Sequence, residues 1–396
     1  MRKAIVCGAG VAGLSAAIAL ARKGWSVEVY ERSDSIREIG AGIFLKGNSL
    51  RVLKELGVLD RILQDGVVLC EARISDKFGR LLQRRLLRDV NAVWNIKREH
   101  LIRVLFNHAI ALGVQINTSS AIDAARPDGT VCCPGRRLTA DLVIAADGAH
   151  SSIRRELKLQ LPARMPKSGA IRLLVERTPH EAEDVMRETW AGRLRVGVSP
   201  CTGTEAFAYL IAPLTDQRGT MVPIDANYWA QKFPNLATQG LFDRAQSATA
   251  VHHPYPMVRT RSWVKGRIAL VGDAAHALPP TLGQGAGLSL MNGLLLAEYV
   301  SSRSDIPKAL VAWEHDWRWV ADRTQVWSRR YDWITAEWPS TLYPLRDAVI
   351  WAIGKSRRFN SYMRVADRLD APAKRVLASA LYLAPLKQQR MPNQNA

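Results

Sequence analysis

Residues 3–13 read KAIVCGAGVAG, a short apolar strand that runs directly into a G-x-G-x-x-G turn. A segment with helical periodicity follows over 11–23, and Gly24 separates it from an alternating strand at 27–31. A strand, a glycine-rich turn, a helix and a second strand therefore fall within about thirty residues. This order predicts an α/β fold with a Rossmann-like domain at the start of the chain.

The glycines of this turn have separate physical roles. Gly8 permits the tight turn, Gly10 lets the backbone approach a pyrophosphate, and Gly13 lets the helix pack closely on the strand. Free amides and the positive end of the helix dipole then favour an anion. Glu31 follows the second strand, where its carboxylate can accept hydrogen bonds from a ribose 2′-hydroxyl and would repel a 2′-phosphate. The pattern favours FAD or NAD, with a purely structural turn as the alternative.

Two distant strings decide between these dinucleotides. Asp147-Gly148-x-x-Ser151-x-x-Arg154 follows a predicted strand at 141–145, and residues 272–285 read GDAAHALPPTLGQG after a buried strand. Together with the first turn, in this order, they resemble the class A flavoprotein monooxygenases, the single-component FAD aromatic hydroxylases. The resemblance runs from about residue 3 to residue 330. It implies a glutathione-reductase-like FAD-binding domain with an inserted β-sheet substrate domain and a C-terminal helical region.

The resemblance also implies how the chain holds FAD. Asp273 would accept a hydroxyl of the ribityl chain, and the glycines after it would let the start of a helix approach the flavin ring. Asp147 is tied in the family to FAD and nicotinamide binding, Arg98 lies in an R-x-x-L pattern, and Arg37 lies in a flavin-facing loop. The cofactor contacts expected are Gly8, Gly10, Ala12, Gly13, Glu31, Arg32, Arg37, Arg98, Ile122, Asp147, Asp273, Gly283, Gly285, Ala286 and Gly287.

Within the family the chain is most similar to bacterial pyridine-ring oxygenases of the 2-methyl-3-hydroxypyridine-5-carboxylate oxygenase type. Matching stretches include residues 40–43 (GAGI) and 284–287 (QGAG). Like that type, the chain has Gly287 where most relatives carry Asn, and Asn292 where most carry Asp.

The same likeness suggests substrate-binding residues. Arg195 matches an arginine near the pyridine carboxylate and could orient an acidic substituent, with a sheet salt bridge as the alternative. Cys70 and Phe207 fall where that type of enzyme has tyrosines, so a less polar or differently substituted ring is expected. Pro280 would shape the pocket over the flavin.

The implied reaction needs no catalytic side-chain nucleophile and no metal. NAD(P)H reduces the flavin, O2 adds to give a C4a-hydroperoxide, and this species hydroxylates an aromatic or N-heteroaromatic ring, with ring opening as a further outcome. A flavin-dependent reductase or halogenase on the same fold is the alternative. A halogenase usually carries W-x-W-x-I-P, whereas Trp317-Arg318-Trp319 is followed here by Val-Ala.

The net charge is +19, from 55 Lys and Arg against 36 Asp and Glu. This charge suggests a third functional class, a basic flavin-free binding protein. The basic residues are dispersed pairs with no recognition motif, which argues against nucleic acid. Five cysteines without a Cys-x-x-Cys pair favour a reducing, cytoplasmic location. The apolar start imitates a signal peptide, but its glycines fit the dinucleotide turn instead.

Composition along the chain predicts four segments. Residues 1–165 form the first FAD-binding part, 166–260 the β-rich substrate domain, 261–330 the resumed FAD-binding part, and 331–396 a basic helical region. The last 57 residues carry ten Lys and Arg against three Asp and Glu, so contact with a membrane or a partner subunit is a minor alternative there. The sequence leaves the oligomeric state open.

Overall fold

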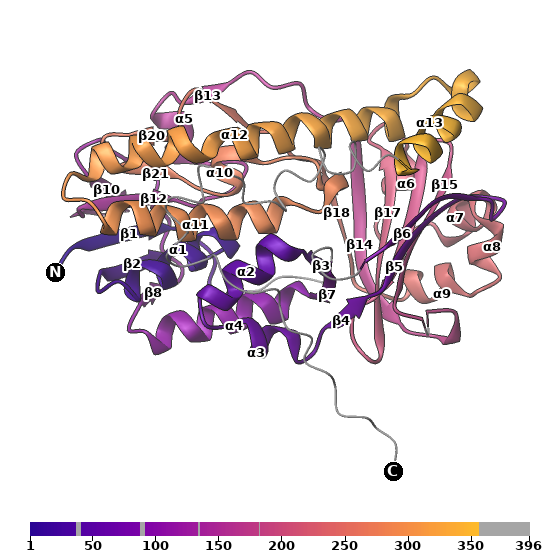
Figure 1. The fold of residues 1–396 in the computed structure, drawn as a ribbon, viewed down its shortest axis with the longest axis horizontal. Coiled ribbons are helices and arrows are strands. Elements are labelled where there is room, and N and C mark those ends of the chain that lie inside the picture. Colours follow the sequence, from indigo (N-terminus) through magenta and orange to yellow (C-terminus); the bar gives the residue numbers. More distant parts are fainter. Residues whose placement is uncertain (37–40, 88–91, 134, 182, 356–396) are drawn as a thin grey trace, which may run out of the picture.

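A computed structural model of the chain describes residues 1–36, 41–87, 92–133, 135–181 and 183–355. Two large sheets lie side by side in it, and a long helix runs from one to the other (Figure 1). Arg37, and the part of the predicted basic region after residue 355, lie outside the described residues.

The first large sheet has six strands and forms the centre of the dinucleotide-binding part. Its strands pair in parallel except at one edge, where the first two are antiparallel. In spatial order they are β20 (Val264–Lys265), β21 (Ile268–Leu270), β12 (Leu142–Ala145), β1 (Lys3–Cys7), β2 (Ser26–Tyr30) and β8 (Gln115–Asn117). The predicted strands at 27–31, 141–145 and 268–271 are confirmed to within a residue at each end.

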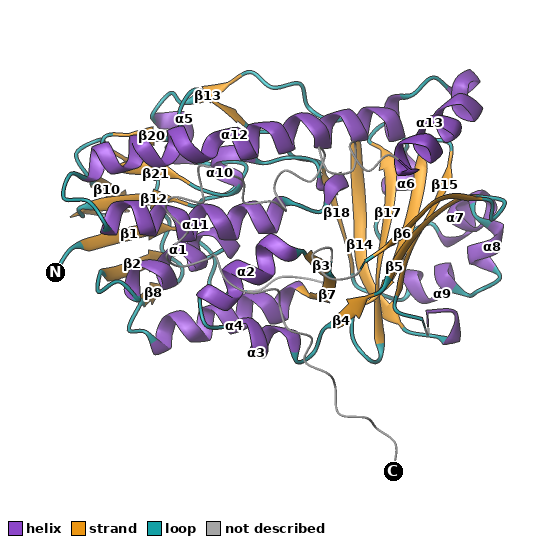
Figure 2. Cartoon of the chain, in the orientation of Figure 1, coloured by secondary structure: helices purple, strands orange, loops and turns teal. Residues whose placement is uncertain are grey.

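The helices α1 (Val11–Ala21), α4 (Arg98–Ala111) and α11 (Gly285–Ser301) pack together, and α1 lies against β1 and β2 (Figure 2). The buried helix α1 packs against α11 so closely that a Cβ at Gly293 would lie 2.6 Å from the backbone nitrogen of Ala16. The predicted helices near 11–23, 49–55, 99–112 and 285–300 are confirmed. The helices of this part are α1 (Val11–Ala21), α2 (Gly47–Glu55), α3 (Leu59–Leu63), α4 (Arg98–Ala111), α5 (Ser152–Glu156), α10 (Asp273–His276) and α11 (Gly285–Ser301).

Short strands complete this part. A three-stranded sheet, ordered β3-β7-β4, lies on the side that faces the second large sheet (Figure 1). The short strands are β3 (Gly42–Leu45), β4 (Val67–Leu69), β7 (Val93–Lys97), β9 (Ala124–Ala125), β10 (Thr130–Cys133), β11 (Arg136–Thr139), β13 (Gln160–Leu161) and β19 (Arg259–Thr260).

The second large sheet has seven strands and corrects one predicted boundary. In spatial order they are β18 (Ala250–Pro254), β14 (Ser168–Glu176), β17 (Glu205–Pro213), β16 (Leu194–Pro200), β15 (Val185–Ala191), β5 (Glu71–Asp76) and β6 (Leu81–Leu86). The prediction placed 71–86 in the FAD-binding part, but β5 pairs in parallel with β15. No local pattern marks this pairing, because the partner strands are more than one hundred residues apart in sequence.

The two faces of this sheet differ. The outer face packs its apolar residues against α7 (Ala226–Lys232), α8 (Pro234–Ala237) and α9 (Leu241–Gln246), around Trp229 and Phe233. The inner face, defined here by the alternate side chains that include Glu188, Arg195, Phe207 and Tyr209, turns toward the FAD-binding part. This face therefore belongs to the boundary between the two large sheets.

The helix α12 (Ile306–Asp332) spans that boundary (Figure 2). Trp313 and Trp317 are buried in the first core. The helix passes the predicted boundary at residue 330 and continues through a π-helical turn (Trp333–Glu337) to α13 (Tyr343–Lys355), which packs on β6. No helix among the described residues is long and apolar enough to cross a bilayer.

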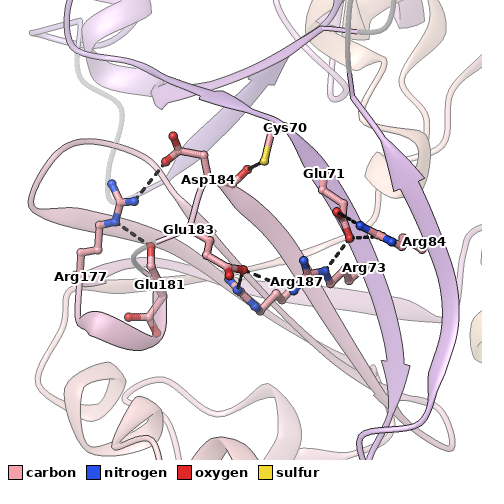
Figure 3. Close-up of polar contacts among 9 residues, drawn as sticks. All are labelled: Cys70, Glu71, Arg73, Arg84, Arg177, Glu181, Glu183, Asp184 and Arg187. Carbon is pink, nitrogen blue, oxygen red and sulfur yellow. Dashed lines mark hydrogen bonds and ion pairs between the residues drawn. The ribbon is translucent and has the colours of Figure 1, made fainter. Parts of the chain in front are cut away.

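Ion pairs fix β5 and its partner strands at the edge of the seven-stranded sheet (Figure 3). The buried carboxylate of Glu71 accepts hydrogen bonds from Arg73 Nε at 2.6 Å and from Arg84 Nε at 2.8 Å. Glu183 pairs with Arg73 and Arg187, which connects β5 to β15. Arg84, followed by Arg73, lowers the pKa of Glu71 to about 2.

The depressed pKa of Glu71 makes this edge sensitive to acid. The stabilisation is fully present above the unfolded value of 4.5 and is lost as the pH falls through the folded value of about 2. We expect Glu71→Gln to lower the free energy of unfolding at about pH 7, with a difference from wild type that shrinks below about pH 4. Urea denaturation at a series of pH values measures it. Glu183→Gln is the control, since exposed pairs contribute about 0–1 kcal/mol, and a pH-independent difference for Glu71→Gln would contradict the assignment.

Candidate active site

Parallel pairing brings the predicted cofactor residues to one edge of the six-stranded sheet. The strands β1, β2, β12 and β21 all end there. Gly8, Glu31, Asp147 and Asp273 each follow one of these ends within three residues. Ligands of open α/β sheets bind outside the carboxyl ends of the strands. The three motifs, far apart in sequence, therefore form one candidate site.

The glycine turn has the shape that a dinucleotide requires. Gly8 has a φ of +107°, and a Cβ there would lie 2.5 Å from the carbonyl oxygen of Ala146. A Cβ at Gly13 would lie 2.0 Å from the carbonyl oxygen of Gly8, so the helix and strand need this glycine to pack. Apart from its chain neighbours, no residue that the structure describes has a heavy atom within 4 Å of a Cβ at Gly10. The start of α1 is therefore open to a pyrophosphate.

Glu31 lies beside this turn. Its carboxylate accepts hydrogen bonds from the backbone N–H of Ala9 at 2.8 Å and of Ser33 at 3.0 Å. These bonds hold the carboxylate beside the turn while leaving lone pairs for a ribose hydroxyl. The neighbouring Arg32 is exposed, and Ile122 is buried in the segment after β8. The roles of Arg32 and Ile122 stay predictions.

The second motif contains an unpaired carboxylate oxygen. Asp147 Oδ2 accepts a hydrogen bond from the backbone N–H of Ile153 at 3.3 Å, whereas Oδ1 is buried and accepts none from the described part of the chain. The adjacent Gly148 has a φ of +82° and open space at its Cβ position. A buried acceptor without a donor is costly unless a ligand supplies one. Asp147 is thus suited to a donor group of the cofactor.

Arg154 connects the second motif to the third, a role that the sequence interpretation missed. Its buried guanidinium donates to the carbonyl oxygens of Ala149 at 2.6 Å and Ala274 at 2.8 Å. Ser151 Oγ caps the short helix α5 by accepting from the backbone N–H of Arg154. The fixed spacing of Ser151 and Arg154 after Asp147 was the available signal. Arg154 therefore holds the Asp147 and Asp273 turns in register.

The third motif places Asp273 at the same edge of the six-stranded sheet. Gly272 has a φ of +58°, which turns the chain sharply after β21, and Asp273 begins α10 with an exposed side chain. A Cβ at Gly272 would lie 2.6 Å from the Cβ of Ala12, so the first and third motifs also touch. His276 is buried 3.1 Å from Asn292 Oδ1, and burial lowers its pKa. His276 is therefore a neutral packing residue.

The start of α11 is held by a segment that the sequence interpretation did not single out. Lys46 donates to the carbonyl oxygen of Leu282, beside Gly283. Asn48 is buried and donates to Gln284 Oε1 at 3.2 Å. A Cβ at Gly287 would lie 2.5 Å from Asn48 Nδ2, so an amide from α2 fills the space next to this glycine. The sequence did carry one signal for this contact, because Gly287 stands where most relatives have Asn.

Gly285 and Ala286 form the first turn of α11. Apart from its own helical turn, no described residue has an atom within 4 Å of a Cβ at Gly285, so its backbone is accessible to a bound ring. The helix dipole would stabilise negative charge there. With the openings at Gly10 and Gly148 and the unpaired Asp147 Oδ1, these residues fit the chemistry of FAD.

Among the predicted substrate-binding residues, Phe207 lies close to the FAD edge, which is the edge of the six-stranded sheet where the predicted cofactor residues gather. A Cβ at Gly42 would lie 2.5 Å from Phe207 Cγ, and the preceding residue, Ala41, accepts a hydrogen bond from the backbone N–H of Arg98. Pro280 is exposed at the turn before α11, and Arg195 is buried deeper on the inner face.

Cys70 is separate from this group. Its side chain is exposed at the start of β5, and Sγ contacts the carbonyl oxygen of Asp184 at 3.1 Å within the surface network of Figure 3. Tyr209, which the prediction omitted, lies next to Phe207 with ring centroids 5.6 Å apart. The Tyr209 hydroxyl donates to Glu188 on the adjacent part of the same sheet.

A parallel sheet whose strand ends carry these three turns defines a dinucleotide-binding flavoprotein. A family model described as FAD binding domain matches residues 1–303. The chain belongs to this family, the class A flavoprotein hydroxylases, and is an FAD-dependent monooxygenase.

Two relatives and one solved structure illustrate the membership. The chain is 35% identical to a 2-heptyl-3-hydroxy-4(1H)-quinolone synthase of Mycobacteroides abscessus, over 89% of this chain and 94% of that protein. A probable 2-heptyl-3-hydroxy-4(1H)-quinolone synthase of Rhodococcus erythropolis is 34% identical, over 82% and 86%. The tetrameric form of 2-methyl-3-hydroxypyridine-5-carboxylic acid oxygenase superposes with a TM-score of 0.81 at 35% identity, covering 93% and 96%. The resemblance and fold class expected from the sequence are confirmed.

Removing the Asp273 carboxylate should weaken FAD binding. A hydrogen bond to a charged group contributes about 1.5–3 kcal/mol, so we expect Asp273→Ala to raise the Kd for FAD about tenfold to a hundredfold. Fluorescence titration of apoprotein with FAD measures it. The matched control is Asp243→Asn, an exposed carboxylate on α9. An Asp273→Ala protein with wild-type FAD affinity would contradict the site.

Asn48 and Gly287 should behave as a coupled pair. Gly287→Asn alone forces a side chain into the space of the Asn48 amide, and overpacking of this kind costs about 1–3 kcal/mol. Gly287→Asn combined with Asn48→Ala should recover most of that loss. Denaturation of the FAD-loaded variants measures the coupling, with Gly203→Asn, at an open loop position, as control. Additive effects of the two substitutions would refute the shared space.

Proposed function

We propose that the protein hydroxylates a small N-heteroaromatic ring, with NAD(P)H as reductant and O2 as oxidant. The observation that carries the proposal is the position of Phe207, which lies against Gly42, with the ring of Tyr209 next to it. Aromatic side chains offer a flat contact for a planar ring. The names of the relatives, a pyridine oxygenase and quinolone synthases, support a nitrogen-containing ring.

The protein's part in this reaction is positioning and electrostatics. When bound, FAD accepts hydride from NAD(P)H and, once reduced, reacts with O2. When FAD is bound, the amides at Gly285 and Ala286 and the dipole of α11 would favour negative charge on the flavin ring. The apolar cluster of Ala41, Cys201 and Phe207 excludes water from the substrate side. Pro280 and Phe207 would hold the substrate ring from two directions.

Substrate-dependent oxygen use tests this function. We expect a hydroxylated pyridine or quinoline to raise the rate of NAD(P)H oxidation by at least about tenfold, because ordered substrate brings the reacting groups together. Oxygen uptake should accompany the oxidation, and the product should gain one oxygen atom. A panel of hydroxypyridines, hydroxyquinolines and hydroxybenzoates provides the comparison.

The same assay separates the alternatives. A reductase would oxidise NAD(P)H and change its substrate without oxygen uptake, and a halogenase would require a halide for product. If no N-heteroaromatic ring in the panel stimulates oxidation while a benzoate does, the proposed ring class is wrong.

A further inference from the structure

Three charged side chains are buried together on the inner face of the seven-stranded sheet. Arg195 lies on β16, Glu188 on the adjacent strand β15, and Asp332 at the last residue of α12. Arg195 and Asp332 are each 2% exposed and Glu188 is 8% exposed. The guanidinium lies between the carboxylates, with Nη1 3.7 Å from Glu188 Oε1 and Nη2 3.9 Å from Asp332 Oδ1. Both separations exceed hydrogen-bond length.

Arg195 and Asp332 keep unused hydrogen-bonding groups. Arg195 Nε and Nη2 and Asp332 Oδ1 are buried and form no hydrogen bond with any described residue. Glu188 differs, because its two oxygens accept from Trp190 Nε1 and the Tyr209 hydroxyl. A buried polar atom without a hydrogen bond is costly even in an ion pair, so the unused atoms point to a ligand that supplies the missing hydrogen bonds.

These atoms lie beside the FAD edge rather than in a remote part of the sheet. Tyr209, which bonds Glu188, packs on Phe207, and Phe207 contacts the Gly42 position. On the other side, Ser328 lies one helical turn before Asp332 and donates to the carbonyl oxygen of Pro279. The charged group is thus bounded by the Gly42 strand and by the Pro279 turn, the two segments that flank the start of α11.

The chemistry of the pair specifies its ligand. Arg195 has only donors to offer, and an ionised Asp332 has only acceptors. A ring edge with an acceptor next to a donor, such as a carbonyl beside an N–H or O–H, satisfies both. A carboxylate satisfies only Arg195 and brings a negative charge close to two buried carboxylates.

Other charges around the group are already paired. Arg172, on the same face, contacts His253 Nδ1 at 3.0 Å, and Arg346 pairs with Asp347. Burial raises the pKa of Asp332 to about 6, while Arg195 opposes this rise and Glu337 adds to it. Asp332 therefore remains mostly ionised above about pH 7.

We infer that Arg195 and Asp332 together select an uncharged heteroaromatic ring with adjacent acceptor and donor groups, and that Glu188 and Asp332 exclude ring carboxylates. This inference rests on the proposed function and narrows its substrate class. It replaces the sequence interpretation in which Arg195 orients an acidic substituent, because the chain supplies its own carboxylates to that guanidinium. Asp332 becomes a specificity-determining residue.

A matched pair of probes tests the inference on the FAD-loaded protein. The first is 3-hydroxy-4-quinolone, with adjacent carbonyl and hydroxyl groups, and the second is its 2-carboxylate derivative. Perturbation of the flavin absorbance gives the Kd of each. We expect the uncharged probe to bind at least about tenfold more tightly to wild type.

Two substitutions separate recognition from folding. Asp332→Asn keeps an acceptor but removes the charge, so the carboxylate probe should gain affinity about tenfold while the uncharged probe changes little. Asp332→Ala removes the acceptor and should weaken the uncharged probe about tenfold. Asp316→Asn, on the same helix but bonded to Tyr299, is the matched control and should leave the ratio unchanged. A purely structural role for Asp332 would not produce a gain in carboxylate binding.

The outcomes distinguish this inference from the proposed function. Equal or tighter binding of the carboxylate by wild type overturns the inference, and so does failure of both probes to perturb a flavin that other N-heteroaromatic rings do perturb. An unchanged ratio in Asp332→Asn also overturns it. If no N-heteroaromatic ring stimulates NAD(P)H oxidation, the proposed function fails as well.

Discussion

The placement of β12 between β1 and β21 is the constraint on which the site depends. Ala145 pairs with Cys7 on one side and with Leu270 on the other, so three chain segments end level with one another. A shift of register would displace one turn by about 3.3 Å per residue and reverse the faces of its side chains. Arg154 strengthens the same alignment because it bonds backbone carbonyls of two turns.

The long helix α12 connects the FAD-binding part to the seven-stranded sheet. Its first turns pack on the six-stranded core through Trp313 and Trp317, and its last residue reaches Arg195 on the other sheet. Ser328 fixes the helix to the Pro279 turn between these points. One helix therefore contacts both the core of the six-stranded sheet and the buried charged group on the seven-stranded sheet.

The sequence predicted what depends on local pattern and missed what depends on distant contacts. The strand ends, the glycine turn and Asp147 and Asp273 were accessible because each stands at a fixed spacing from a strand or helix. The pairing of β5 with β15 was not, since neither strand carries a sign of its partner. Asn48 was missed because its role exists only where α2 meets Gly287. Likewise, nothing near Arg195 indicates that Asp332, more than one hundred residues later, lies beside it.

The basic residues behind the net charge of +19 do not gather at one site in the described part of the chain. Many of the described Lys and Arg residues pair with carboxylates, as around Glu71, or donate to backbone carbonyls, as Arg154 and Arg346 do. In the buried group of Arg195, Glu188 and Asp332 the balance is reversed, because one guanidinium faces two carboxylates. The chain's overall charge therefore does not predict the charge of its ligand.

Hydrogen exchange with and without FAD tests the central claim, that three distant turns form one cofactor site. We predict that FAD protects the amides of 8–13, 147–151 and 283–287 together, with the same dependence on FAD concentration. Protection confined to 8–13, with the other two segments unchanged, would contradict it.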